Sequence, residues 1–236
     1  MKKKIVVTGG RGRFARCLRK IKTNYTMLFP KKNILDVTNY KKVKRYFDLH
    51  KPRIVIHLAA LSRPMNLHKK DVKKSIDVNI IGTSNVTKAC VKNNTKLIYF
   101  STNYVYPGTK GNYKETDALL PVNNYAWSKL GGESAVQMYK NSLILRVCMT
   151  EKPFVHKSAF KNVKTSFIYH EDVAKLLFKL LNKKGIINIG GKTRSAYNFA
   201  KRDNPNIKKA YLKKRNILPK NSSVNISKMA KILKIY

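Results

Sequence analysis

The alternation of short, continuous apolar runs with longer amphipathic stretches restricts the fold of this chain more than any other feature. Runs such as KIVVT at 4–8, RIVIHLAA at 53–60 and KLIYFST at 96–102 carry mostly apolar side chains on successive residues, rather than on every second one. A strand of this kind is buried on both faces, which is typical of a parallel sheet with helices on each side. The sequence therefore predicts an α/β fold built on a doubly wound parallel sheet.

The remaining strands and helices follow from the same periodicity. Further strands are expected at 25–29, 142–147 and 185–191. Helices are expected at 13–22, 39–50, 71–93, 123–140 and 171–181, where apolar residues recur every three or four positions. Thr38 or Asn39 is the expected start of the second helix, because both side chains can accept hydrogen bonds from free N–H groups.

The charge of the chain bears on its partners. The 236 residues include 51 Lys and Arg but only 11 Asp and Glu, which gives a net charge of +40. Such a field attracts anionic substrates and gives a salt-sensitive affinity for nucleic acid. The lysines are spread along the whole chain, and Asn, Ile and Tyr are abundant too, as an A/T-rich genome would encode. We therefore expect nucleic-acid binding to be nonspecific at most, with compositional drift as the source of the charge.

Neither a membrane nor a metal is expected as a partner. No apolar run approaches the roughly 20 residues of a membrane-spanning helix. The start, MKKKIVVTGG, has too short an apolar part for a signal peptide, which favours a mature N-terminus. Cys17, Cys90 and Cys148 form no disulfide framework, which favours a reducing cytoplasm, or the host cytoplasm for a viral protein. The five histidines show no metal-binding spacing.

A glycine-rich turn follows the first predicted strand. TGGRGRFA, at 8–15, connects that strand to the first helix, which is the context of a dinucleotide-binding fingerprint. Gly9 permits the tight turn, Gly12 lets a pyrophosphate approach the backbone, and Ala15 allows close helix–strand packing. Free N–H groups at the start of the helix would face the phosphates. The turn predicts a Rossmann-type cofactor site, with an ordinary turn as the alternative.

The charges near this turn bear on which dinucleotide binds. Arg11 and Arg13 lie in the turn, and Lys31 and Lys32 follow the second strand, where an NAD site usually carries an acidic residue. Cations at these positions suit a 2′-phosphate and favour NADPH as the cofactor. Asp36 keeps NADH open, because it lies near the usual spacing of the acid that binds the ribose. Its alternatives are a contact with the adenine or a role in capping the next helix.

Tyr125 and Lys129 are one turn apart on the predicted helix 123–140 and therefore share a face. A phenol with a pKa near 10 is a poor acid–base group at neutral pH, and a nearby ammonium lowers that pKa. Ser101 and Thr102 end the fourth strand, at the edge of the sheet where open α/β folds bind ligands. Their hydroxyls are placed to bind a substrate carbonyl. An ordinary amphipathic helix is the alternative for the Tyr–Lys pair.

In these segments the chain resembles the extended short-chain dehydrogenase/reductases, and within them the dTDP-4-dehydrorhamnose reductase branch. The combination of STNYVYPG with YAWSKLGGE is the most specific part of the resemblance. The matching segments occur in the family's order over nearly the whole chain: TGGRGRFA, LDVTN, HLAA, DVNIIGT, STNYVYPG, YAWSKLGGE, LILRV, FIYHEDVAKLL, GIINIGG, SAYNFA and LPKNSSVNISKMAKIL.

The resemblance implies an NADPH-dependent reductase of a nucleotide-linked 4-keto-6-deoxyhexose, in the biosynthesis of rhamnose-type nucleotide sugars. It implies that Thr102 and Tyr125 bind and protonate the substrate ketone, with Lys129 tuning the phenol. Asn79 would lie on the helix behind the site, with an ordinary surface amide as its alternative. The expected substrate-binding residues are Thr102 and Asn103, and the expected cofactor-binding residues are Gly9, Arg11, Gly12, Arg13, Phe14, Lys31, Asp36, Val37, Ala59, Ala60, Leu61, Tyr125 and Lys129.

The strand–helix pattern loosens after about Arg146, which predicts two parts: a dinucleotide-binding domain at 1–148 and a small α/β substrate-binding lobe at 149–236, interleaved with it. Two departures from the family bear on the substrate. Asn103 follows Thr102 where the reductases often carry Asp, and the segment Thr150–Thr165 is shorter than usual. A shorter segment fits a smaller substrate, lost activity, or a pocket completed by the second subunit of a homodimer. Asn103 and Tyr104 cannot supply the acid–base pair that related sugar-nucleotide dehydratases need.

Two other functions stay open. An epimerase with the same residues would retain NAD tightly and return the hydride to the same sugar. A non-catalytic, cofactor-binding regulatory protein would keep the fold without turnover. The short substrate lobe and the extreme charge favour this last function, whereas the intact set of Thr102, Tyr125 and Lys129 argues against it.

Overall fold

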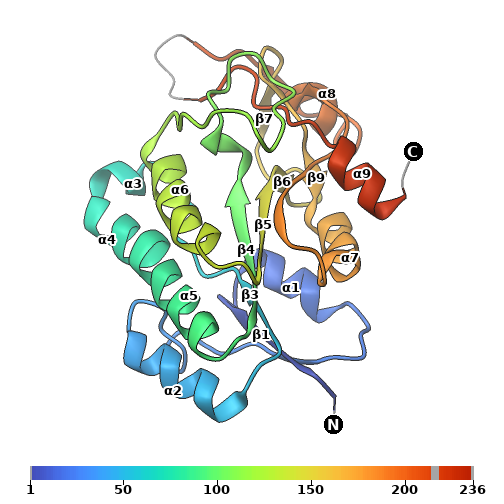
Figure 1. Cartoon of the computed structure of the whole chain (residues 1–236). Helices are drawn as coiled ribbons and strands as arrows, with labels where there is room; N and C mark the ends of the chain where they lie inside the picture. The colour runs from blue at the N-terminus through green and yellow to red at the C-terminus, as the bar shows by residue number, and fades with distance from the viewer. Residues whose placement is uncertain (1, 214–217, 235–236) are drawn as a thin grey trace.

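A computed structural model describes residues 2–213 and 218–234, and it confirms the predicted α/β fold. A six-stranded parallel sheet lies at the centre, in the order β10-β5-β4-β3-β1-β2 (Figure 1). The strand order changes direction next to β1, which places the switch point of the sheet between β1 and β3. The strands are β1 (Lys4–Thr8), β2 (Thr26–Leu28), β3 (Ile54–His57), β4 (Lys96–Thr102), β5 (Ser142–Val147) and β10 (Gly185–Ile189).

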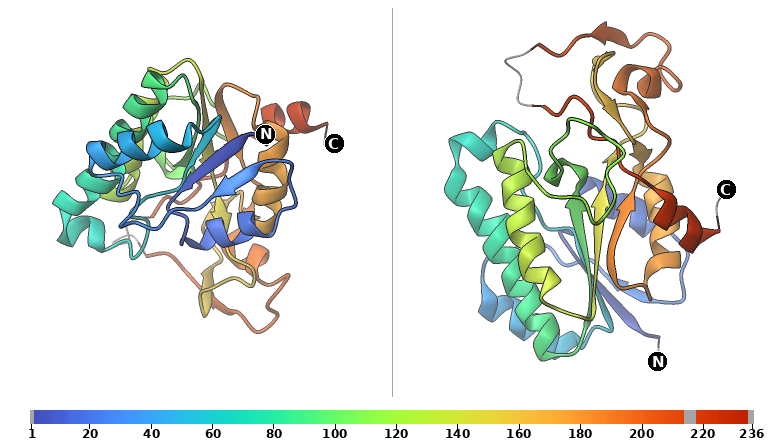
Figure 2. Two further views of the ribbon diagram at one scale, coloured as in Figure 1. Left: turned by 90° about the horizontal axis from the view of Figure 1, so that it is seen from below. Right: turned by 45° about the horizontal axis from the view of Figure 1, so that its top comes forward.

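Helices cover both faces of this sheet, as its continuous apolar strands require (Figures 1 and 2). On β1, Ile5 and Val7 pack in the cluster that includes residues of α1 and α7, whereas Val6 packs in the cluster that includes residues of α2 and α5. One layer contains α2 (Tyr40–His50), α5 (Gly82–Lys92) and α6 (Asn124–Gln137), and the other contains α1 (Arg13–Arg19), α7 (His170–Leu180) and α9 (Ser227–Leu233).

The helix predicted at 71–93 is not regular. It consists of α4 (Val72–Ile76), a π-helical turn η1 (Asp77–Ile81) and α5, and a short helix α3 (Leu67–Lys70) precedes it. Asn79 lies inside the π-helical turn, and the hydroxyl of Thr83 donates to its carbonyl oxygen at 2.7 Å. Turns of this kind often mark functional sites, because the extra residue re-aims a side chain. Asn39 is the N-cap residue of α2, and its side chain accepts a hydrogen bond from the N–H of Lys42.

A group of short elements lies beyond the carboxyl ends of the central strands (Figure 1). Their apolar side chains form a separate small cluster around Phe154, Tyr169 and Phe199. The sequence did not predict these strands, because two or three residues carry no periodicity. They are the pairs β6 (Met149–Thr150) with β9 (Ile168–Tyr169), β7 (Ser158–Phe160) with β12 (Lys208–Ala210), and β8 (Lys164–Thr165) with β11 (Arg194–Ser195), next to α8 (Ala196–Ala200).

Three elements after residue 148 belong to the central layers rather than to this small group. The strand β10 pairs with β5, and α7 and α9 pack in the same apolar cluster as α1. The division at 148/149 stays a prediction, and Met1, 214–217 and 235–236 of the two predicted ranges lie outside the described residues. Within the described part of the chain, the helices are all too short or too polar to cross a membrane.

Candidate active site

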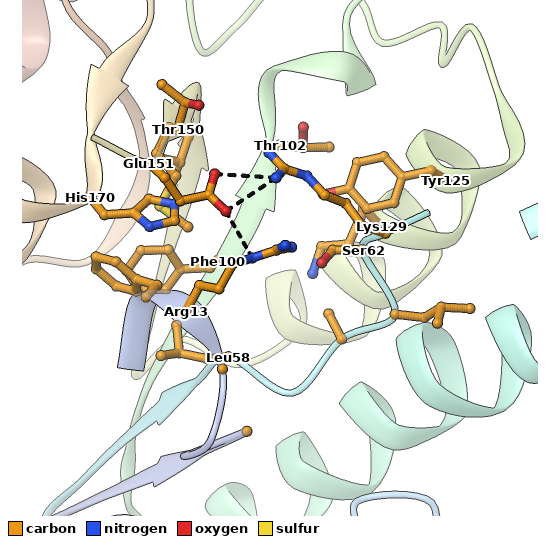
Figure 3. Close-up of a pocket in the computed structure, with 18 of the residues that line it drawn as sticks. Arg13, Leu58, Ser62, Phe100, Thr102, Tyr125, Lys129, Thr150, Glu151 and His170 are labelled. Atoms are coloured by element: carbon orange, nitrogen blue, oxygen red, sulfur yellow. Dashed lines mark hydrogen bonds and ion pairs between the residues drawn. The ribbon is translucent and has the colours of Figure 1, made fainter. Parts of the chain in front are cut away.

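A cavity of about 1220 Å³ lies at the carboxyl ends of the central strands (Figure 3). Its lining includes the glycine turn after β1, the segment after β3, the end of β4 and the exit of β5. Of the residues predicted for the site, all but Lys31 line this cavity. Lys31 lines a second hollow, which shares Arg11, Lys32 and Asp36 with the first. The fold therefore brings the predicted residues together around one space.

The glycine turn is as tight as the fingerprint predicts. Gly9 has a φ of +66°, and a Cβ on it would lie 2.7 Å from the backbone nitrogen of Ala59. The N–H of Gly12 donates to the carbonyl of Gly9 at 2.8 Å, and a Cβ on Gly12 would lie 3.1 Å from the same oxygen. Gly9 has room for bare backbone alone and Gly12 has little more, which fits the close approach of a diphosphate.

A buried histidine connects this turn to the neighbouring strand. The Thr8 oxygen accepts from the N–H groups of Leu58 and Ala59, both at 3.1 Å, so its own proton points to His57 Nδ1 at 2.7 Å. Nε2 of His57 then donates to Thr83 Oγ1 at 3.0 Å. Burial lowers the pKa of His57 to about 3, with a smaller contribution from Lys129, so the ring is neutral. His57 is thus a structural link that the sequence did not reveal.

Asn79 holds the segment that follows β3. Its amide oxygen accepts from the N–H of Leu61 at 2.7 Å, and its amide nitrogen donates to the Leu61 carbonyl at 2.9 Å. The same nitrogen also donates to Ser128 Oγ at 2.8 Å, and Ser128 donates to the carbonyl of Tyr125 at 2.8 Å. Asn79 is fully buried, so the alternative of a surface amide is wrong. It connects two walls of the cavity.

Tyr125, Thr102 and Lys129 lie on one side of the cavity, opposite Glu151 and His170 (Figure 3). Burial raises the pKa of Tyr125, while the neighbouring hydroxyl of Thr102 and the charge of Arg63 oppose this rise. The phenol therefore holds its proton at neutral pH. Arg63 is thus one cation that acts on Tyr125, and the same role for Lys129 stays a prediction.

Lys129 is itself strongly perturbed. Its side chain is buried, and its Nζ lies 4.2 Å from the centre of the Tyr99 ring, within the range of a cation–π contact. Burial lowers the pKa of Lys129 to about 7, and the nearby carboxylate of Glu133 opposes the fall. The ammonium of Lys129 is therefore able to release and take up a proton near neutral pH.

The two hydroxyls predicted at the end of β4 have different roles. Thr102 faces Tyr125, but Ser101 donates to Glu133 Oε2 at 2.5 Å, which corrects the expectation that it binds a substrate carbonyl. Glu133 also accepts from Arg146 Nη2 at 2.6 Å, and both side chains of this ion pair are buried. A buried carboxylate is stable only when it is paired and hydrogen-bonded, and Ser101 supplies one of these hydrogen bonds.

Asn103 lines the cavity, but its side chain is committed elsewhere. Its amide nitrogen donates to the carbonyl of Ser222 at 2.9 Å, which ties the end of β4 to the segment before α9. Its amide oxygen lies 3.5 Å from Thr102 Oγ1. The bond to Ser222 leaves Asn103 little freedom to contact a substrate through its nitrogen.

The charged residues of the cavity that the sequence analysis missed include Glu151 and Arg63. Glu151 forms ion pairs with both Arg13 and Arg63 (dashed lines in Figure 3). One arginine among 51 cations carries no signal of its own, so Arg63 could not be distinguished. Within residues 2–213 and 218–234, no cluster of three or more His, Cys, Asp or Glu side chains could hold a metal ion.

Comparison with known sequences adds a family and two kinds of relative. A family model described as "RmlD substrate binding domain" matches residues 2–166. A dTDP-4-dehydrorhamnose reductase from Aggregatibacter actinomycetemcomitans is 32% identical over 152 residues, which cover 62% of this chain and 51% of that protein. A methionine adenosyltransferase 2 subunit beta from Xenopus laevis is 30% identical over 155 residues, which cover 61% and 46%. The chain spans about half the length of these relatives.

Solved structures share the whole fold. A dTDP-4-dehydrorhamnose reductase from Bacillus anthracis, in complex with NADP, superposes with a TM-score of 0.89 at 24% identity, covering 100% of this chain and 94% of that one. A UDP-glucose 4-epimerase from Thermus thermophilus, in complex with NAD, gives a TM-score of 0.76 at 17% identity, covering 98% and 92%. At these identities the likeness establishes the fold.

Proposed function

The chain belongs to the family described as RmlD substrate binding domain, and on that premise we propose that it reduces the keto group of a nucleotide-linked 4-keto-6-deoxyhexose with NADPH. The observation that carries the proposal is the convergence of Thr102, Tyr125 and Lys129 on one cavity that also contains the glycine turn. A relative named dTDP-4-dehydrorhamnose reductase supports this substrate class. The products would be activated sugars of the rhamnose type.

In this proposal Tyr125 is the proton donor. NADPH, when bound, supplies the hydride. The raised pKa of Tyr125 keeps the phenol protonated until a keto oxygen accepts its proton, as a general acid requires. The hydroxyl of Thr102 orients the phenol and the keto oxygen. Arg63 then stabilises the phenolate that is left, and Lys129, with a pKa of about 7, returns a proton to it.

The charges at the far end of the cavity support NADPH over NADH. Asp36 Oδ1 accepts from the N–H and the hydroxyl of Thr38, at 3.0 and 2.8 Å, so one oxygen of this carboxylate is already engaged. Arg11, Lys31 and Lys32 line the hollow beside it. Three cations around one hollow suit a 2′-phosphate, and we propose that they bind it.

Further proposals concern assembly and location. Val72, Ile76, Ile81 and Trp127 expose apolar surface on α4, η1 and α6, which supports a homodimer. Nucleic-acid binding would be nonspecific and driven by the net charge of +40. A reducing cytoplasm is the proposed compartment, and the three cysteines are free thiols.

A turnover assay with one conservative variant tests the proposed function. Tyr125→Phe removes the proton donor and keeps the ring, so NADPH oxidation with a dTDP-4-keto-6-deoxyhexose should fall by about 100-fold or more. Binding of NADPH should be unchanged. Tyr46→Phe on α2, outside the cavity lining, is the matched control and should retain full activity. An equal rate for wild type and Tyr125→Phe would refute the role of Tyr125.

A second candidate is a cofactor-binding subunit without turnover. One relative is named a subunit of methionine adenosyltransferase 2, and it matches at nearly the same identity as the reductase. Calorimetric binding of NADPH together with no turnover on a panel of nucleotide sugars would favour this candidate. NAD that copurifies and survives dialysis would instead favour an epimerase.

A further inference from the structure

Glu151 lies between two arginines from separate segments of the chain (Figure 3). Its Oε1 is 2.9 Å from Arg13 Nε, and Arg63 Nη1 donates to both carboxylate oxygens, at 3.1 and 3.2 Å. Arg13 begins α1 after the glycine turn, Arg63 follows β3, and Glu151 follows β6. These contacts form the Arg13–Glu151–Arg63 bridge, which joins three segments that line the cavity.

The carboxylate is the inner member of this bridge. The side chain of Glu151 is 16% exposed, whereas those of Arg13 and Arg63 are 42% and 36% exposed. Burial would raise the pKa of Glu151, but Arg63 and Arg13 lower it overall, so Glu151 is an anion at neutral pH. Asp36 is the other carboxylate in the cavity lining, and it accepts from Thr38. Glu151 is therefore the anion in the lining that pairs with Arg63, the cation that lowers the pKa of Tyr125.

Two guanidinium groups around a carboxylate offer the same donors that bind phosphate groups. Arg13 lies beside the turn that would bind the diphosphate of a dinucleotide. Arg63 lies close enough to Tyr125 for its charge to lower the pKa of that phenol. A dinucleotide that reaches from the turn to Tyr125 would bring its phosphates close to Arg13 and Arg63. Glu151 already forms ion pairs with both of these arginines. Like charges in one place oppose binding.

We infer that Glu151 limits the affinity for dinucleotides. Its carboxylate competes with the phosphates of the ligand for Arg13 and Arg63. The inference rests on the proposed function for the identity of the ligand. It predicts that Arg13 and Arg63 contribute more to the affinity for the ligand when residue 151 carries no charge. It also predicts that the effect of Glu151 depends on Arg63.

Glu151→Gln tests this inference, because it removes the charge and nearly preserves the shape. NADPH, titrated by fluorescence, should bind at least about threefold more tightly than to Asp172→Asn. Asp172→Asn changes the net charge by the same amount as Glu151→Gln. Asp172 is exposed in the first turn of α7 and lies outside the cavity lining, so its variant controls for the change in net charge. Arg63→Gln should weaken binding, and adding Glu151→Gln to it should restore little, since the two residues act as a pair.

Equal affinities in Glu151→Gln and Asp172→Asn, or weaker binding in Glu151→Gln, would overturn the inference. Inorganic pyrophosphate, followed by the shift in melting temperature, separates this result from the proposed function. If NADPH binds no variant, but pyrophosphate stabilises Glu151→Gln more than Asp172→Asn, the function is wrong and the inference stands. If NADPH is turned over but neither ligand distinguishes the two variants, the function stands and the inference fails.

Discussion

Asn79 and Leu61 are joined by two hydrogen bonds: the N–H of Leu61 donates to the amide oxygen of the buried asparagine, and the amide nitrogen donates to the Leu61 carbonyl. The two bonds fix the segment after β3 against the helical layer. Because Asn79 also reaches Ser128 and through it the carbonyl of Tyr125, one amide positions both the cofactor wall and the proposed proton donor.

Asn79→Ala should therefore weaken NADPH binding by about tenfold and lower the melting temperature, since the backbone groups of Leu61 lose their partners. Asn93→Ala is a matched control, because Asn93 lies outside the cavity lining and its amide donates to the Ala89 carbonyl of the adjacent helix α5. A fluorescence titration of NADPH measures the difference. Equal affinities for the two variants would contradict the positioning role of Asn79.

Lys129 should make stability depend on pH. Its pKa is about 7 in the folded chain and near 10.5 in the unfolded one, so unfolding takes up a proton between these values. The contribution of Lys129 to stability is therefore gained as pH rises from 7 and is at most about 1.4 kcal/mol per pH unit. Urea unfolding at pH 7 and about pH 8.5 should show a steeper rise for wild type than for Lys129→Met. Parallel curves would place Lys129 in a more solvated environment than the structure gives it.

The Glu133–Arg146 pair should be sensitive to the loss of one partner. The atoms Oε1 and Nη2 are 2.6 Å apart, and the side chains are 0% and 3% exposed. Glu133→Gln leaves the guanidinium buried without its counter-charge, which should lower the free energy of unfolding by about 3–5 kcal/mol. Asp48→Asn, which breaks the exposed Lys44–Asp48 pair, should change it little. Equal effects in urea unfolding would show that the buried pair contributes no more than a surface pair.

The central sheet could be predicted from the sequence, because its strands are continuous apolar runs between amphipathic helices. The glycine turn and the Tyr125–Lys129 spacing gave the two ends of the cavity for the same reason: local pattern fixes local geometry. The π-helical turn around Asn79 could not be predicted, since the bonds that favour it come from Leu61 and Ser128, distant in the chain.

The electrostatics of the cavity were also beyond the sequence. Whether a charge is buried depends on packing between segments, which decides that Lys129 has a pKa of about 7 and that Ser101 serves Glu133 instead of a substrate. The chain has 51 Lys and Arg residues, and no local sequence pattern indicates that Arg63 in particular forms an ion pair with Glu151. The short strands beyond the sheet pair through long-range contacts and were missed for the same reason.

Hydride transfer is the central claim, and NADPH deuterated at the transferring position of its nicotinamide tests it most directly. After incubation with wild-type protein and a dTDP-4-keto-6-deoxyhexose, mass spectrometry and NMR should find deuterium on the former keto carbon, with one NADP⁺ formed for each sugar reduced. Unlabelled sugar beside unconsumed NADPH would contradict the account.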